Sequence, residues 1–208
     1  MPCLIEEDVS ATKTKIPLAD AEAHAKRLRD LFDGCYERWE FAGSIRRRRP
    51  EVGDIDHVVI SKWIEVPNDL FGTMRLESAM AIRAHELWRD RILIIRSTGD
   101  RRTSVTFEGV PHELYYCFAE NWGPILAIRT GSSDFARCLV TRLRRRGHRQ
   151  HEGYLHRVLD HCTGRFNESF GDGQFGERLD CPTEEAYFAA AGLNASDWPP
   201  TRREVGPT

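Results

Sequence analysis

An apolar stretch at residues 54–61 begins with two aspartates, Asp54 and Asp56. Residues two apart on a strand point to the same face of a sheet. The neighbours at 55 and 58–60 are isoleucine or valine, so we expect a central strand covered on both faces. Two adjacent carboxylates near a core repel each other and lose hydration, and they stay ionised where a divalent cation lies between them. The competing interpretation is that one or both lie at an exposed strand end.

A segment suited to phosphate binding lies about ten residues upstream of these acids. Gly43 and Ser44 follow an expected strand, and Arg46 and Arg47 come next. Glycine allows close backbone approach, and arginine forks onto phosphate oxygens. Mg²⁺ is commonly held by one or two carboxylates together with substrate phosphates. This pattern is typical of phosphoryl and nucleotidyl transfer, in which the protein mainly positions the reactants and neutralises charge.

A third carboxylate would complete a two-metal site. Glu113 is the best candidate, because it lies in the middle of the expected strand 111–116. An edge-strand glutamate without a catalytic role explains it about equally well on local sequence alone. Glu108 is the rival acid.

The remaining periodicities predict a mixture of helices and short strands. We expect helices at about 17–34, 74–88, 132–147 and 183–191. We expect strands at 38–42, 54–61, 92–96, 103–108 and 112–118, a hairpin at 153–181 turning at 171–173, and a loose arm at 1–15.

The composition of the 208 residues, with 40% hydrophobic and 30% charged side chains, excludes a disordered or fibrous chain. No apolar run approaches the roughly 20 residues that span a bilayer, so no membrane association is expected. The N-terminus lacks the apolar core of a secretory signal, and the six cysteines form no CxxC pair. We therefore expect reduced thiols and a cytoplasmic protein.

The charge is uneven, although its formal total is only −2. Residues 129–157 hold eight arginines against Asp134 and Glu152. Such a block can contact a polyanion, although a solvated helix face is the commoner explanation. The residues that we expect to contact nucleic acid are Arg142, Arg144, Arg145, Arg146 and Arg149.

The pattern Gly-Ser-x-Arg-Arg-x5-Gly-Asp-x-Asp at 43–56 resembles the signature of family X DNA polymerases, the DNA polymerase beta-like nucleotidyltransferases. The segment 129–135, the glycine at 147 followed by 152–154, and the acidic helix at 182–193 resemble later segments of that family in the same order. The resemblance covers about residues 36–205.

The resemblance implies an α+β fold: a polymerase beta-like palm with a short mixed sheet, backed by helices, and a small C-terminal nucleotide-binding subdomain. Its expected divisions are an N-terminal arm and helix at 1–35, a catalytic palm at 36–128 and a thumb-like subdomain at 129–208. We expect a minimal form without the family's N-terminal lyase domain.

Carried over residue by residue, the resemblance assigns Asp54, Asp56 and Glu113 as catalytic residues and ligands of Mg²⁺ (or Mn²⁺). Ser44 and Arg47 would bind the triphosphate with help from the backbone at Gly53, and Gly131 would lie against the sugar. The remaining nucleotide-binding residues would be Gly43, Thr130 and Ser132.

Three departures from the family pattern are visible. The third acid is Glu113 rather than aspartate, Ile128 and Arg129 replace an aromatic pair, and Ala136 stands where an asparagine is expected.

The expected reaction is attack of a DNA 3′-hydroxyl on the α-phosphate of a (d)NTP, with release of pyrophosphate. The expected partners are a DNA primer end and the (d)NTP, bound by a monomer. One alternative is a nucleotidyltransferase that modifies a small molecule, RNA or protein. Another is a catalytically inactive nucleic-acid-binding module.

Overall fold

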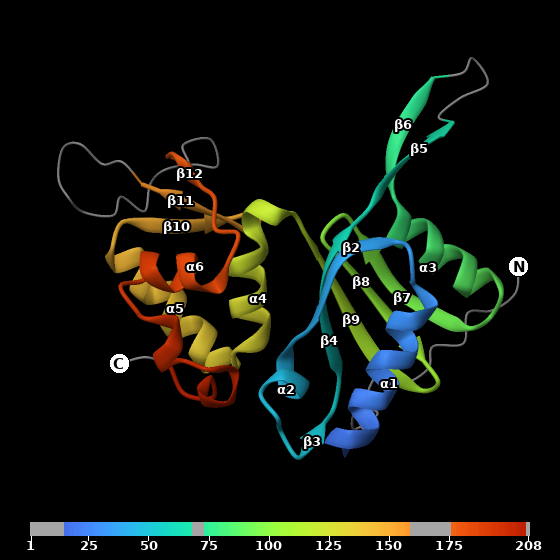
Figure 1. The fold of residues 1–208 in the computed structure, drawn as a ribbon, viewed down its shortest axis with the longest axis horizontal. Coiled ribbons are helices and arrows are strands. Elements are labelled where there is room, and N and C mark those ends of the chain that lie inside the picture. The colour runs from blue at the N-terminus through green and yellow to red at the C-terminus, as the bar shows by residue number, and fades with distance from the viewer. Residues whose placement is uncertain (1–14, 68–72, 159–175, 207–208) are drawn as a thin grey trace, which may run out of the picture.

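A five-stranded mixed sheet forms one half of the structure, in the strand order β2-β4-β9-β8-β7 (Figure 1). The computed structural model describes residues 15–67, 73–158 and 176–206. The sheet strands are β2 (Tyr36–Phe41), β4 (Ile55–Ser61), β7 (Leu93–Gly99), β8 (Arg102–Phe107) and β9 (Val110–Cys117). All five were predicted from the sequence, with ends that differ by a few residues.

The two central strands, β4 and β9, run parallel, whereas the other pairs in this sheet are antiparallel. Their register places Asp56 directly opposite Glu113. Since side chains alternate between the faces of a strand, these two acids point to the same side of the sheet. β4 is buried along almost its whole length, as its run of isoleucine and valine predicted.

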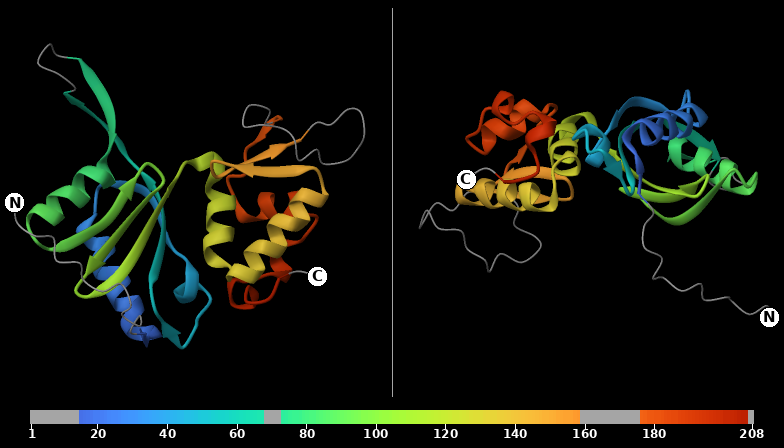
Figure 2. Two further views of the ribbon diagram at one scale, coloured as in Figure 1. Left: turned by 180° about the vertical axis from the view of Figure 1, so that it is seen from behind. Right: turned by 90° about the horizontal axis from the view of Figure 1, so that it is seen from below.

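Two helices, α1 (Leu18–Leu31) and α3 (Ala79–Arg89), cover the opposite face of the sheet (Figure 2, right). Leu28 of α1 and Met80 of α3 meet Val59 and Leu114 of the central strands in the largest hydrophobic cluster. The predicted first helix is confirmed, and it ends before Gly34, which has a φ of +82°. This packing leaves the face with the acids open to the rest of the molecule.

The predicted helix at 74–88 is wrong at its start. Met74–Ser78 forms strand β6, which pairs with β5 (Trp63–Pro67) in a hairpin that projects from the body (Figure 1). α3 begins only at Ala79, where the Ser78 side chain accepts a hydrogen bond from the amide of Ala81 at 3.2 Å. Pairing with β5 therefore overrides the helical spacing of these residues.

The C-terminal part contains three helices and a small sheet, with α4 facing the central sheet (Figure 1). Its elements are α4 (Trp122–Thr130), α5 (Ser133–Arg145), α6 (Glu184–Ala190), β10 (His148–His151), β11 (Tyr154–Arg157) and β12 (Arg178–Leu179). Ser132 caps α5 and Thr183 caps α6, and both helices were predicted from the sequence. The sequence analysis missed α4.

The two ends of the predicted hairpin at 153–181 do pair, because β11 runs antiparallel to β12; β10 is an additional strand that the sequence analysis did not predict. β11 pairs with β10 and β12, and the β10–β11 turn lies at Glu152 and Gly153, which both have positive φ. The predicted turn at 171–173 and almost all of the predicted arm at 1–15 lie outside the described residues.

The remaining elements are short. They are β1 (Ile16–Pro17), which pairs with β3 (Glu51–Val52), the one-turn helix α2 (Gly43–Arg46), and the 3-10 helices η1 (Ala119–Asn121), η2 (Ala195–Asp197) and η3 (Pro200–Arg202). Within the described ranges, no helix has the length and apolar character needed to cross a membrane.

A chain of buried histidines runs beneath the two central strands. The indole nitrogen of Trp39 donates to His57 Nδ1 at 3.1 Å, His57 Nε2 lies 2.9 Å from His112 Nδ1, and His112 Nε2 lies 3.1 Å from His24 Nδ1. His24 Nε2 lies 3.3 Å from the carboxylate of Glu108. Since indole only donates and a carboxylate only accepts, each of these three histidines must be neutral and protonated at Nε2.

The histidine chain predicts a pH-dependent stability difference. Burial lowers the pKa of His112 to about 3. Below about pH 6.5 this histidine is therefore protonated in the unfolded chain but still neutral in the folded protein. His112 therefore stabilises the fold above that pH, and the contribution is lost as pH falls towards 3.

Between pH 7 and pH 4 the wild type should lose about 3 kcal/mol more unfolding free energy than His112→Gln does, because glutamine does not titrate. Urea unfolding at a series of pH values measures this difference. The exposed His85 on α3 provides the control, and His85→Gln should run parallel to wild type. A constant difference between His112→Gln and wild type would contradict the neutral chain.

Candidate functional site

The turn between β2 and α2 is built around the carboxylate of Asp56. Gly43 opens α2 with a φ of +52°, and a Cβ placed there would lie 1.9 Å from Asp56 Oδ2. Only glycine tolerates both the left-handed backbone and this close approach. The chain therefore lays its backbone directly against the carboxylate that the sequence analysis placed at the centre of the site.

Asp56 lies in a field of like charge. Burial is the largest cause that raises its pKa, to about 7, and the negative charges of Asp54 and Glu113 add to it. Arg129 and Arg47 act in the opposite direction. The three acids that the sequence singled out therefore lie near enough to interact electrostatically, with Asp54 just before β4, Asp56 near its start and Glu113 in the middle of β9.

Glu113 is only partly satisfied. Its Oε1 accepts a hydrogen bond from Ser104 Oγ at 2.8 Å, and its Oε2 lies 3.5 Å from Arg102 Nε. Oε2 is buried and has no hydrogen-bond partner among the described residues. The rival acid, Glu108, pairs instead with Arg27 and His24, on the side of the sheet that α1 covers.

The donor set suits a hard divalent cation, since it consists of carboxylate oxygens, which Mg²⁺ prefers. A bound cation would stabilise the buried Oε2 of Glu113, which has no hydrogen-bond partner among the described residues, and the carboxylate of Asp56, whose pKa is raised. As the side chains stand, no three His, Cys, Asp or Glu residues in the described parts are grouped closely enough to hold a metal ion. Glu113 is turned towards β8 and would have to leave Ser104 to join the other two acids.

Arg46 forms a partly buried bridge from α2 to the C-terminal part. It donates to both oxygens of Glu184 at 2.9 and 2.7 Å and to the Thr130 hydroxyl at 2.7 Å. Arg203 pairs with the same carboxylate and is itself 2% exposed. Burial raises the pKa of Glu184, but the hydrogen bonds from the two arginines outweigh it and hold the pKa below its usual value.

Arg47, predicted to bind phosphate, also contacts the C-terminal part. Its Nε donates to Glu204 at 2.7 Å, one terminal nitrogen donates to the Thr130 carbonyl at 2.7 Å, and the other lies 3.4 Å from Ser44 Oγ. Ser132 donates to the Glu204 carbonyl at 2.6 Å. Of the predicted nucleotide residues, Ser44 and Thr130 thus contact Arg47, and Arg47 and Ser132 contact Glu204.

The two other predicted glycines differ in their surroundings. A Cβ on Gly131 would lie 2.3 Å from the Phe135 ring, so glycine is required there for packing within the C-terminal part. A Cβ on Gly53 would have only Lys15 within 4 Å, at an ordinary 3.8 Å.

The arginines at 142–149, on α5 and just after it, do not form one continuous exposed surface. Arg142 and Arg146 donate to the carbonyls of Ala191 and Ala190, at the end of α6, at 3.1 and 3.2 Å. Arg144 and Arg145 are exposed, and Arg149 lies on β10 and is half-buried.

The sequence analysis missed two features of the site. Arg129, noted only as a departure from a family pattern, places its guanidinium 3.9 Å from the centre of the Tyr115 ring and acts electrostatically on Asp56. Glu184 and Glu204 partner the arginine pair, but Glu184 is 138 residues from Arg46 in the sequence. An acid in the first turn of a helix is expected for electrostatic reasons alone, so nothing in the sequence indicated that Glu184 also pairs with Arg46.

Comparison with known proteins shows the fold. No family model and no curated protein matches the sequence. Among solved structures, the chain is similar to Leishmania infantum polymerase beta, determined as a ternary P/T complex, with a TM-score of 0.68 and 16% identity over 92% of this chain and 77% of that one. The protein therefore has a polymerase beta-like α+β fold, as the sequence predicted.

The contact between Gly43 and Asp56 can be tested with a matched pair of glycines. Gly43→Ala places a methyl group on the Asp56 carboxylate, whereas Gly34→Ala meets the same left-handed strain with nothing within 4 Å. Gly34→Ala should cost about 1–2 kcal/mol of stability and keep Mn²⁺ affinity. Gly43→Ala should weaken Mn²⁺ binding at least tenfold, measured by electron paramagnetic resonance of free Mn²⁺. Equal Mn²⁺ affinity of the two variants would contradict the assigned contact.

The raised pKa of Asp56 predicts that this carboxylate destabilises the metal-free fold. An aspartate whose folded pKa exceeds its unfolded value opposes folding increasingly as pH rises from about 4 to about 7. With EDTA present, the unfolding free energy of Asp56→Asn should rise by about 3–4 kcal/mol relative to that of wild type as the pH is raised from 4 to 8. Denaturant unfolding measures this change, and a pH-independent difference would show that Asp56 is not crowded by charge.

Proposed function

We propose that this protein transfers a nucleotidyl group from a (d)NTP to a DNA 3′-hydroxyl and releases pyrophosphate. The observation that carries the proposal is the register that sets Asp56 opposite Glu113, beside Asp54, on a polymerase beta-like fold. Paired acids on a shared face are the arrangement that this reaction needs, because charge neutralisation supplies most of its catalysis.

Asp54, Asp56 and Glu113 would hold Mg²⁺ or Mn²⁺. When bound, such ions neutralise phosphate charge and lower the pKa of an attacking hydroxyl. Asp56 binds a proton below about pH 7 in the metal-free protein, so it is available as a ligand above that pH. Glu113 is one methylene longer than aspartate, and this extra reach lets it contact Ser104 on the neighbouring strand.

The triphosphate would lie along Ser44 and Arg47. Arg47 has five N–H donors, and its recorded contacts with Glu204, Thr130 and Ser44 leave others for phosphate oxygens. The same contacts orient its planar guanidinium, so less freedom is lost when phosphate binds. Gly131 and Ser132 open α5 nearby and would contact the sugar side of the nucleotide.

DNA is the proposed acceptor because the similar solved structure is a ternary P/T complex. A nucleotidyltransferase with another acceptor is the second candidate. It is favoured by the arginine block, in which Arg142 and Arg146 each donate Nε–H to a carbonyl at the end of α6, so that these side chains also serve packing within the C-terminal part.

A primer-extension assay with Mg²⁺ and dNTPs, on recessed, gapped and single-stranded DNA, tests the proposal. Wild type should add nucleotides, and Asp56→Asn and Glu113→Gln should each lower kcat/KM by at least about a thousandfold, since each removes a metal-binding charge. Glu108→Gln is the control, because Glu108 is an acid of the same strand pair that lies outside the site.

Extension by wild type with Glu113→Gln fully active would remove Glu113 from the mechanism. No nucleotide added to any DNA would remove the DNA polymerase function. Incorporation into RNA or a small hydroxyl compound under the same conditions would then favour the second candidate.

A further inference from the structure

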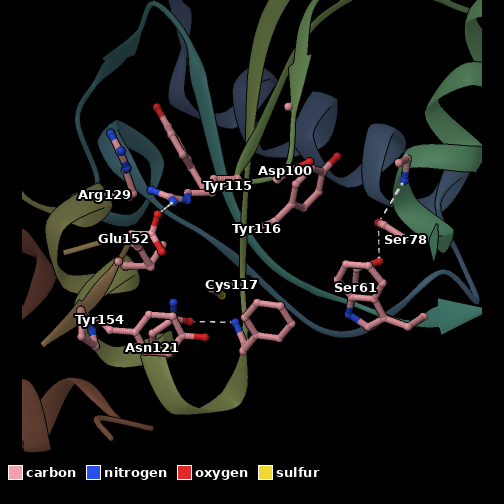
Figure 3. A pocket seen from close by; sticks show the side chains of 18 of the residues that line it. Ser61, Ser78, Asp100, Tyr115, Tyr116, Cys117, Asn121, Arg129, Glu152 and Tyr154 are labelled. Carbon is pink, nitrogen blue, oxygen red and sulfur yellow. Dashed lines mark hydrogen bonds and ion pairs between the residues drawn. The ribbon is translucent and has the colours of Figure 1, made fainter. Parts of the chain in front are cut away.

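A pocket of about 890 Å³ opens next to the carboxylates (Figure 3). It lies between the end of β9, the β5–β6 hairpin, α4 and the turn of β10–β11. None of the three acids lines it, but Tyr115 and Arg129 do. The proposed transfer reaction does not account for this pocket.

The walls of the pocket present flat aromatic rings. Trp63 of β5 and Phe118, just after β9, stack with nearly parallel planes, 6° apart, and stay 48% and 44% exposed. Tyr154 of β11 and Tyr115 of β9 also line it, and each carries an arginine over its ring. Exposed, clustered aromatic surface marks a binding site, and flat rings select a flat partner.

The charges that line the pocket largely cancel. Arg101 pairs with Glu152 across the gap between the β7–β8 turn and the β10–β11 turn, and Arg75 pairs with Glu77 at 3.1 Å. A groove that follows a run of phosphates would be lined by unpaired cations. This lining therefore suits a single uncharged aromatic group better than a stretch of sugar–phosphate backbone.

The pocket and the carboxylate site share a wall. Tyr115 follows Glu113 by two residues on the same face of β9, and Arg129 acts on both Asp56 and Tyr115. A strand whose 3′ end lies at the acids would thus bring neighbouring nucleotides to the mouth of the pocket.

We infer that this pocket binds an unpaired base of single-stranded DNA, stacked on Trp63, when DNA occupies the active site. Bases stack on aromatic side chains regardless of their identity, so the pocket would accept any of the four. The inference rests on the proposed function for its choice of DNA as ligand. Its energetic basis, the Trp63 stack, can be tested separately from catalysis.

The test is DNA binding in EDTA, where no transfer reaction occurs. Fluorescence anisotropy compares a blunt duplex with the same duplex that carries a short single-stranded overhang. Trp63→Leu should weaken binding of the overhang DNA about tenfold and leave blunt-duplex affinity unchanged. Trp63→Tyr keeps a flat ring and should retain most of the affinity.

Trp88→Leu is the matched control, because Trp88 is similarly exposed, at 53%, but lies on α3 outside the pocket. It should bind both DNAs as wild type does. As an independent measurement, 2-aminopurine in the overhang should be quenched by wild type and by Trp88→Leu, but not by Trp63→Leu.

Equal overhang affinity of wild type and Trp63→Leu would overturn the inference, even if the protein extends primers. Loss of overhang affinity in Trp63→Leu, from a wild type that extends no primer, would support the inference and remove the proposed function instead. Absence of any DNA binding by wild type would overturn both.

Discussion

Two acids that repel each other define this structure. The parallel pairing of β4 and β9 sets Asp56 opposite Glu113, and Gly43 packs its backbone against the Asp56 carboxylate so that this side chain cannot move aside. Burial and like charge raise the pKa of Asp56 to about 7. Burial and the neighbouring acids therefore favour the protonated form of Asp56 in the metal-free protein.

The second constraint joins the two parts of the molecule. Arg46 and Arg203 share the buried carboxylate of Glu184, and Arg47 is held by Glu204 and the Thr130 carbonyl. Removing one member of this partly buried group leaves a charge without its partner, which costs stability. The segment 43–47 is thus fixed by the C-terminal part.

Helices and strands whose residues follow a clear local periodicity could be predicted from the sequence. Residue composition predicted the strand that carries Glu113, and the helical spacing predicted α5 and α6 close to their observed bounds. α4 was missed because it is buried on nearly every side, so its sequence has no polar face to reveal a helix. Met74–Ser78 has helical spacing but pairs with β5, and the Arg46–Glu184 bridge spans 138 residues, beyond any local pattern.

The most direct test of the central claim is anomalous diffraction from crystals grown with Mn²⁺ and a non-hydrolysable nucleotide. Our account predicts an anomalous peak bonded to Asp54, Asp56 and Glu113 at about 2.0–2.3 Å, with Glu113 turned away from Ser104. A peak elsewhere, or Glu113 still bonded to Ser104 with no density between the acids, would contradict it.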